Sequence, residues 1–573
     1  MSNGDVTMNA DRSRETALAV CSAAFVLLAA AGSAAGQQVT SALLPDSAAE
    51  RLVAFHNLET TTRLSGDARI GPGTVMRGGV AVLGGSLSVE GTVEGDVAVI
   101  NGDLIVLPGG TVAGNATVAG GAAEFDPGAV AGTVRVYREP LRYRYLDGMI
   151  DYVPPDLEEG LSTGRDFGFG RTELRITSYG AYNRAEGLPV AAGPRIRFGG
   201  THPVTARAFL IARTAVPPDL ERKRVGYDIL ADQLVAPDLG LSLGVQLFAV
   251  ITPIELWGLT DRESALATFV LHTDYRDHYE REGWAAFAHL ARPGMPYALR
   301  LEYRDEEHAR TPVADPVALL PADEPWRPEA SIAEGNVQSL VASLRYDTRN
   351  EERDPSAGWL IDAGIEKAIG GTLVNPGSFD PDSAQAVRRD ASTSFLTGRV
   401  DVRAYARLSP YARISLRVIG AGSLDGRPLP PQRQHALGGE GSLPGYRLFE
   451  FDCGARINTV NVAGDSFHPY YGCDRMAVVQ LEYQAGFPFA RRVSEALGLG
   501  STLGYLARWV AFFDAGRAWN EPGSSDGRFG GNADFSADAG LGIRLGPLGG
   551  YWTVPLSGHG HGFNLFVRVA PRI

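Results

Sequence analysis

Alternation of apolar and polar residues is the feature that most constrains how this chain can fold. The segment 399–408 (RVDVRAYARL) is apolar at every second residue, and 204–213 (VTARAFLIAR) and 412–418 (ARISLRV) follow the same pattern. Because successive side chains of a strand point to opposite faces, such segments predict strands with one apolar and one polar face. Residues 171–573 are dominated by this pattern.

Period alone does not say whether the apolar faces meet a protein core or lipid. In a water-soluble sandwich they form the core, whereas in a membrane barrel they meet lipid and the polar faces line the lumen. Strands of about ten residues that end in Gly, Asp or Pro loops match the dimensions of a membrane. We therefore predict an all-β protein with a transmembrane antiparallel β-barrel over 171–573, of about 16 strands. The alternating final segment, 563–573, suits the last strand of a closed barrel.

The N-terminus predicts export. Arg12 and Arg14 precede an apolar run over 17–31, and small residues follow as far as Gly36. This order is typical of a signal peptide over residues 1–36, cleaved near Ala35 or Gly36. The alternative, an uncleaved anchor, needs about 20 apolar residues. No later run is long and apolar enough for a spanning helix, and an exported chain can still cross a membrane as a closed barrel.

Glycine-rich repeats precede the predicted barrel. The chain contains 70 glycines, and the triplet Gly-Thr-Val recurs at Gly73, Gly91 and Gly110, at spacings of 18 and 19 residues. Short alternating strands with glycine corners at this period predict the coils of a β-helix. The region 60–136 resembles bactofilin-like, polymer-forming β-helices. Residues 37–59 would form an N-terminal segment before it, and the proline-containing residues 137–170 a linker after it.

Several segments, taken in order, resemble a known family. A loop motif, GGEGSLPGYR, spans 438–447, and it is flanked by 344–350 (LRYDTRN), 479–483 (VQLEY) and 512–516 (FFDAG). These segments resemble the BamA/TamA-like outer-membrane assembly superfamily, also called bacterial surface antigens. The resemblance covers roughly residues 170–573. The residues that carry the loop motif are Gly441, Leu443, Pro444, Gly445, Tyr446 and Arg447.

The resemblance implies a working loop inside the barrel. In the family this loop folds into the lumen, where its arginine pairs with a Glu and an Asp on neighbouring strands. By position these acids would be Glu482 and Asp514, and Glu482 shares its face with polar neighbours. The position of the arginine is Pro444 here, and proline offers no donor. Arg447 is either the substitute that binds the carboxylates or a solvated loop residue.

A disulfide is expected in the same loop. Cys453 and Cys473 lie 20 residues apart, and an exported chain folds in an oxidising compartment. Closing a loop of that length would stabilise the fold by about 3 kcal/mol in the chain-entropy model. Its role would be structural.

The sequence departs from the assembly family in one respect. Members that insert or translocate proteins carry periplasmic POTRA domains, whereas residues 40–170 hold the predicted β-helix. Enzymatic chemistry is not expected either. The G-x-S-x-G pattern at 160–164 lacks the apolar strand of a nucleophile elbow, and this removes a patatin-like lipase. His559 and His561 are too few ligands for a metal site. We expect no cofactor, and the net charge of −13 argues against nucleic acid.

Three functions remain open. The first is outer-membrane biogenesis or transport through the lumen and lateral seam of the barrel. The second is a passive channel or receptor. The third is a structural envelope anchor whose β-helix self-associates. We expect the barrel in the bacterial outer membrane and the N-terminal domain in the periplasm, with outer-membrane lipid, and other envelope proteins or further copies of this chain, as partners.

Overall fold

The computed structural model covers two β-structured parts. The described residues are 38–41, 44, 46–126, 128–146, 149–152, 161–215, 225–292, 295–320, 323, 325–330, 332–349, 354–374, 394–409, 412–451, 453, 460–462, 465–467, 472–487, 507–520, 535–557 and 563–573. The predicted signal peptide and the pair His559 and His561 lie outside them. The all-β prediction is confirmed: the described helices are α2 (Asp46–Asn57), α3 (Asp261–Leu271) and the short η1 (Pro431–Arg433). Neither α-helix there is long and apolar enough to cross a bilayer.

The N-terminal part is a β-solenoid, as predicted. Its strands pair in parallel and form three stacked sheets, in the orders β1-β13-β11-β8-β5-β2, β12-β9-β6-β3 and β10-β7-β4. These strands are β1 (Gln38–Ser41), β2 (Thr62–Ser65), β3 (Ala68–Ile70), β4 (Val75–Met76), β5 (Val80–Leu83), β6 (Leu87–Val89), β7 (Thr92–Val93), β8 (Val97–Ile100), β9 (Leu104–Val106), β10 (Thr111–Val112), β11 (Ala116–Ala119), β12 (Ala123–Glu124) and β13 (Val134–Tyr137).

Stacked small side chains form the solenoid core. Val80, Val97, Ala116 and Val134 lie in register on successive coils and are buried. Since each coil covers the apolar residues of the next, no coil is stable alone. Helix α2 packs on the outside of the first sheet through its own buried apolar residues.

Glycine at one corner lets the coils approach closely. A Cβ atom on Gly102 would lie 2.0 Å from the carbonyl oxygen of Gly85, and one on Gly121 would lie 1.9 Å from that of Gly102. Both contacts are with backbone, which cannot rotate away. The repeated glycines are therefore a steric requirement of the stack.

The C-terminal part is a 17-stranded antiparallel sheet in which each strand pairs with the next in sequence. Its strands are β16 (Leu161–Phe167), β17 (Gly170–Ser178), β18 (Pro189–Phe198), β19 (Val204–Arg213), β20 (Val225–Ala236), β21 (Leu241–Pro253), β22 (His278–Leu290), β23 (Tyr297–Arg310), β24 (Glu334–Asp347), β25 (Gly358–Val374), β26 (Leu396–Ser409), β27 (Ala412–Ser423), β30 (Arg475–Gly486), β31 (Ala507–Trp519), β32 (Ser536–Leu545), β33 (Leu548–Pro555) and β34 (Asn564–Arg568). Two hairpins lie outside it, β14 (Tyr143–Leu146) with β15 (Met149–Tyr152), and β28 (Val460–Val462) with β29 (Asp465–Phe467).

The two faces of this sheet differ as a membrane barrel requires. Side chains such as Asp401, Arg417 and Gln480 are buried on the lumen side, whereas Leu301, Ile543 and other large apolar residues are exposed on the outer side. The first strand, β16, begins at Leu161, within the segment assigned to the linker. Ser162 of the G-x-S-x-G pattern lies inside β16, not on a turn from a strand to a helix.

The connections define two ends of the barrel. We call the end that carries the long connection between β27 and β30 the loop end, and the opposite end the turn end. The solenoid contacts the turn end, where Arg407 of β26 pairs with Asp103 at 2.8 Å and with Glu124 at 3.4 Å. Arg138 pairs with Asp347 of β24 at 2.9 Å. The solenoid is thus joined to the barrel by buried or half-buried ion pairs.

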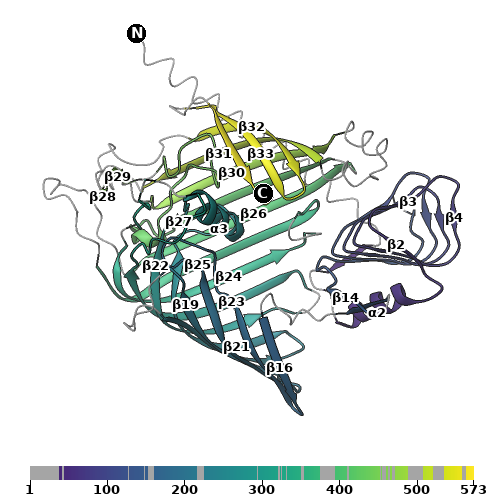
Figure 1. Cartoon of the computed structure of the whole chain (residues 1–573), viewed down its shortest axis with the longest axis horizontal. Helices are drawn as coiled ribbons and strands as arrows, with labels where there is room; N and C mark the ends of the chain where they lie inside the picture. Colours follow the sequence, from purple (N-terminus) through teal and green to yellow (C-terminus); the bar gives the residue numbers. More distant parts are fainter. Residues whose placement is uncertain are drawn as a thin grey trace, which may run out of the picture.

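The two edges of the sheet are β16 and β34, and we call the boundary between them the seam. Among the described residues β16 pairs with β17 and β34 with β33, and no hydrogen bonds join β16 to β34. In Figure 1 the dark blue β16 and the yellow β33 lie on opposite sides of α3, with β23–β26 behind them. The seam is therefore held by groups other than a strand ladder.

We predict that Gly102→Ala destabilises the solenoid. The added methyl group meets backbone, so the cost should reach at least the roughly 1–3 kcal/mol typical of overpacking. Protease resistance of residues 60–136 in the full-length protein measures it. The matched control is Gly71→Ala, where the nearest atom to the new Cβ is Thr74 Oγ1 at 4.0 Å. Equal protease resistance of the two variants would contradict the close approach of the coils at Gly102.

Candidate functional site

The loop motif lies inside the barrel at the loop end. Leu443 and Tyr446 are buried against Ile419, Val478 and Ala518, the lumen-facing apolar residues of β27, β30 and β31. The loop is also bonded within itself, since the Gly439 amide donates to the Tyr446 carbonyl and the Tyr446 amide to the Leu443 carbonyl. The motif therefore packs as a compact unit on the inner wall.

Hydrogen bonds fix this unit to two strands, β30 and β32. The Gly445 amide donates to Asp538 Oδ2 of β32 at 2.8 Å, and Tyr446 donates from its hydroxyl to the Ala537 carbonyl at 3.0 Å. Gln480 of β30 donates to the Ser442 carbonyl at 3.2 Å. A Cβ atom on Gly445 would lie 2.8 Å from Asp538 Cβ, so only glycine fits this approach. Gly441 lies beside Gly258, in the connection that leads to α3.

Pro444 and Arg447 face away from the predicted acids. The Pro444 carbonyl accepts a hydrogen bond from Asn564 Nδ2 of β34 at 2.9 Å. Arg447 is exposed, and its backbone amide donates to Glu450. The structure therefore does not bring Arg447 to Glu482 or Asp514, although both acids are buried on the lumen side of neighbouring strands.

Arg572 occupies the position between these acids. Its guanidinium forms an ion pair with Asp514, and its Nη1 lies 3.7 Å from Glu482 Oε2. All three side chains are at most 1% exposed. In the described part of the chain no other cation comes within ion-pair distance of either acid. Arg572, four residues beyond the end of β34, thus makes the contact that the resemblance assigned to a loop arginine.

Aromatic rings surround the same guanidinium. The Arg572 guanidinium carbon lies 3.6 Å from the centroid of the Phe512 ring, 5.8 Å from that of Tyr551 and 5.9 Å from that of Phe566. A cation over aromatic faces is attracted by their quadrupoles, and the attraction grows when water is excluded. The two carboxylates and the three aromatic rings together bind the guanidinium of Arg572.

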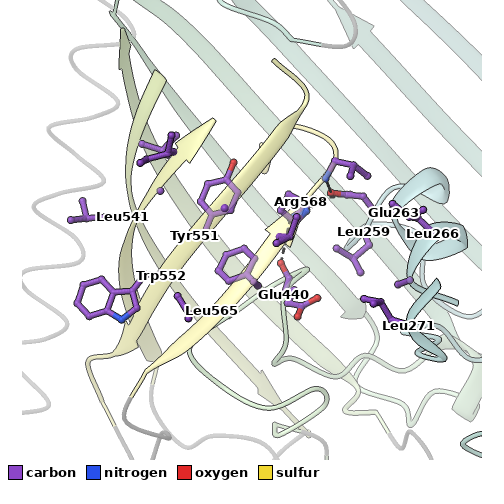
Figure 2. A pocket seen from close by; sticks show the side chains of 18 of the residues that line it. Leu259, Glu263, Leu266, Leu271, Glu440, Leu541, Tyr551, Trp552, Leu565 and Arg568 are labelled. Carbon is purple, nitrogen blue, oxygen red and sulfur yellow. Dashed lines mark hydrogen bonds and ion pairs between the residues drawn. The ribbon is translucent and has the colours of Figure 1, made fainter. Parts of the chain in front are cut away.

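A second arginine ties β34 to helix α3. Arg568 Nη2 donates to Glu263 Oε2 at 2.9 Å, and Arg568 Nη1 donates to the Glu440 carbonyl of the loop motif at 3.3 Å. Figure 2 shows Arg568 and Glu263 pointing toward one another from β34 and α3. Glu263 also closes the capping box of α3 with Thr260, so its carboxylate is fixed at the start of the helix.

The other side of α3 reaches the opposite edge of the sheet. The rings of Phe269 and Tyr182, which lies in the β17–β18 connection, are 5.5 Å apart. In the same connection the fully buried Arg184 donates from its backbone to Asp274 Oδ2 at 2.9 Å and pairs with Glu329 at 2.8 Å. Helix α3 and the residues after it therefore connect β34 with the region of β17 and β18.

An apolar cavity of about 940 Å³ lies along this contact. It is lined by Leu266 and Leu271 of α3 on one side and by Trp552, Leu565 and Val567 of the last strands on the other. Glu440 of the loop lies at its polar end. Burial raises the pKa of Glu440 above its usual range, while a hydrogen bond from Tyr275 and the charge of Arg568 act in the opposite direction.

A disulfide joins Cys453 to Cys473, with a Cα–Cα distance of 4.8 Å. Cys473 is fully buried beside Leu437 and Met476, in the apolar cluster that also holds the loop motif. The bond therefore attaches the outer part of the loop to the start of β30.

Two functional features were missed by the sequence reasoning. Arg572 lies at the end of an alternating segment, and no sequence pattern indicates that its side chain extends into the lumen. Helix α3 did carry a signal, because Thr260 followed by Glu263 is a capping-box pattern. That short helix was overlooked inside a region dominated by strand patterns.

We predict that Arg572→Ala loosens the loop and the last strand. It leaves Asp514 and Glu482 buried without a cation, and breaking a buried ion pair from one side typically costs about 3–5 kcal/mol. The measurements are thermal unfolding of the folded barrel and protease cleavage within 424–474. Arg447→Ala is the matched control and should change neither, because its side chain is exposed. The reverse result would assign the contact to Arg447.

Residues 329–557 match the Omp85 superfamily domain. No curated protein sequence matches the chain. Among solved structures, BamA from Haemophilus ducreyi lacking POTRA domains 1–3 is 15% identical, with 75% of this chain and 74% of that chain covered and a TM-score of 0.40. CdiB from Acinetobacter baumannii is 12% identical over 70% of this chain and 60% of that chain, with a TM-score of 0.30. CdiB from Escherichia coli is 12% identical over 75% and 67%, with a TM-score of 0.30.

The Omp85 match covers the β24–β33 region, including the loop motif, Glu482 and Asp514. It confirms the family resemblance on which the expected loop was based. The chain therefore contains an Omp85 superfamily domain, which forms the β24–β33 part of its β-barrel, and a β-solenoid precedes the barrel.

Proposed function

We propose that this protein acts in outer-membrane biogenesis or transport through a seam between β16 and β34 that can open. The solenoid would face the periplasm at the turn end, and the loop end would face outward. In this proposal the loop motif and helix α3 are the parts that hold the seam, and Glu482 and Asp514 are the acids that hold Arg572.

One observation carries the proposal: β34 is held by contacts in the lumen. Arg572 pairs with Asp514 and Glu482, Arg568 pairs with Glu263, and Asn564 bonds to the loop. One edge of β34 is joined to β33 by a strand ladder. Its other edge is fixed by a few side chains, so it can be released by a few substitutions or by a client, which a full ladder of backbone hydrogen bonds would prevent. This arrangement suits a wall that opens sideways.

The contents of the lumen favour this function over a passive channel. The loop motif is packed against β27, β30 and β31, and α3 bridges from β34 toward β17. A pore that only admits solutes does not need an apolar loop packed on its inner wall. The docked solenoid is compatible with an envelope anchor, and that role becomes an outcome of the tests below.

Exchanging the charges of Glu263 and Arg568 tests the seam contact. Glu263→Arg alone places two cations together and should lower thermal stability and raise open-channel noise in planar bilayers. Arg568→Glu alone places two acids together and should do the same. The double exchange restores opposite charges but not the capping box of α3, so it should recover part of both readouts. A coupling of about 0.5–3 kcal/mol is typical of residues in contact. Additive damage in the double variant would show that the contact does not hold the seam.

Depletion in the native host tests the function. We expect loss of the protein to alter the inventory of outer-membrane proteins or lipids, and wild-type chain to restore it. Arg572→Ala should restore it only in part. A normal inventory would remove the biogenesis and transport proposal. Large steady conductance of the purified protein would then support a channel, and altered envelope shape alone would support an anchor.

A further inference from the structure

The outer wall carries a groove away from the seam. It has a volume of about 770 Å³, within the range of ligand sites, and crosses β23–β27. Its sides are apolar, and Gly398 and Gly420 lower its floor because they place no side chain on the outer face. The large apolar residues that line it are Leu301, Leu344, Ile365, Val400 and Leu424. Each of these side chains is at least 38% exposed, so the groove is open to the surroundings of the barrel.

Basic residues gather where this groove reaches the loop end. Arg475 lines the groove, and its Nε donates to the Ser423 carbonyl at 2.9 Å. Lys367 and Arg427 lie beside the same turn, where each pairs with Asp425, at 3.5 Å and 4.0 Å. We call Lys367, Arg427, Arg475 and Arg517 the basic rim.

Trp519 lies next to this rim and completes the end of the groove. It pairs across the strands with Arg475, and the guanidinium carbon of Arg517 lies 4.9 Å from the centroid of its ring. Tryptophan is enriched at the level of lipid headgroups on membrane proteins. The rim therefore marks the height at which the groove leaves the hydrocarbon layer.

We infer that this groove binds one membrane lipid whose headgroup carries an anionic phosphate. An acyl chain would lie along Leu301, Leu344 and Val400, and the phosphate would meet Arg475 and Arg517. The groove is continuous with the outer face of the barrel, so a chain can enter from the bilayer without leaving it. Guanidinium groups match phosphate oxygens in geometry as well as charge. The lipid belongs to the leaflet at the loop end.

A lipid explains both halves of the site. A soluble phosphate would have no use for the apolar groove, and an uncharged apolar ligand would have none for the rim. None of the described residues that line the groove belongs to α3 or to the loop motif. The inference requires only that the barrel lies in a membrane, and it is independent of the proposed role in biogenesis.

Native mass spectrometry of the full-length protein tests the inference. The probes are phosphatidylglycerol and phosphatidylcholine with identical acyl chains, because both carry phosphate but only the first has net negative charge. Wild-type protein should retain one phosphatidylglycerol in preference to phosphatidylcholine. The double variant Arg475→Gln/Arg517→Gln should bind it about thirtyfold more weakly, from about 1 kcal/mol for each cation. Arg165→Gln, on β16, is the matched control and should bind as wild type.

A second variant addresses the groove itself. A Cβ atom on Gly420 would have Val400 Cγ1 at 3.7 Å as its nearest neighbour, so Gly420→Leu can fill the groove without moving the backbone. It should lower lipid retention while the rim stays intact, and glycerol phosphate, which lacks acyl chains, should bind neither protein. Equal retention of the two lipids by wild type, or full retention by the double variant or by Gly420→Leu, would overturn the inference. If the variants misfold, the wild-type protein is measured in high salt instead. Loss of its preference for phosphatidylglycerol would support the inference, and a preference that persists would contradict it.

Discussion

The seam of this barrel depends on one buried ion pair, that of Arg572 with Asp514 and Glu482. Taking a guanidinium and carboxylates out of water costs several kcal/mol for each ion, so such a contact persists only where geometry and further partners compensate. Here the Arg572 guanidinium lies over the Phe512 ring, and the loop motif is hydrogen-bonded to Asp538 and Gln480 on the strands of this wall. Loss of the cation would leave the acids buried with that cost uncompensated. The position of residues 569–573 inside the barrel is therefore fixed by charge.

The pairing of strands extends this constraint to the whole seam. Strand β34 has five residues, and among the described residues its ladder reaches only β33. A short edge strand has few backbone hydrogen bonds to hold it, so the side chains of Asn564, Arg568 and Arg572 determine where it lies. Their partners come from the loop motif, from α3 and from β31, three segments far apart in the sequence. Any movement of α3 or of the loop would consequently displace the edge of the sheet.

The architecture could be read from the sequence because it follows from local pattern. Period-two alternation and glycine corners at intervals of 18 and 19 residues determine strands and coils directly. The placing of Glu482 and Asp514 on one inner face followed from alternation plus family resemblance. The partner of these acids could not be read, because Arg572 reaches them through the bend of residues 569–573 and the curvature of the sheet. Both are tertiary features without a local signature. A capping box marked α3, but no local rule indicates that its Glu263 meets an arginine 305 residues later.

The solenoid now has a place that its sequence did not reveal. Its contacts on the barrel, Arg407 of β26 and Asp347 of β24, belong to strands in the middle of the sheet order, far from β16 and β34. Arg407 lies on the lumen face of its strand, since it shares parity with Asp401 and Arg403. The corner at Asp103 thus meets the mouth of the barrel on the side opposite the seam. In the proposed function, a solenoid docked there would not block β34 at the turn end, because its described ion pairs are with β24 and β26.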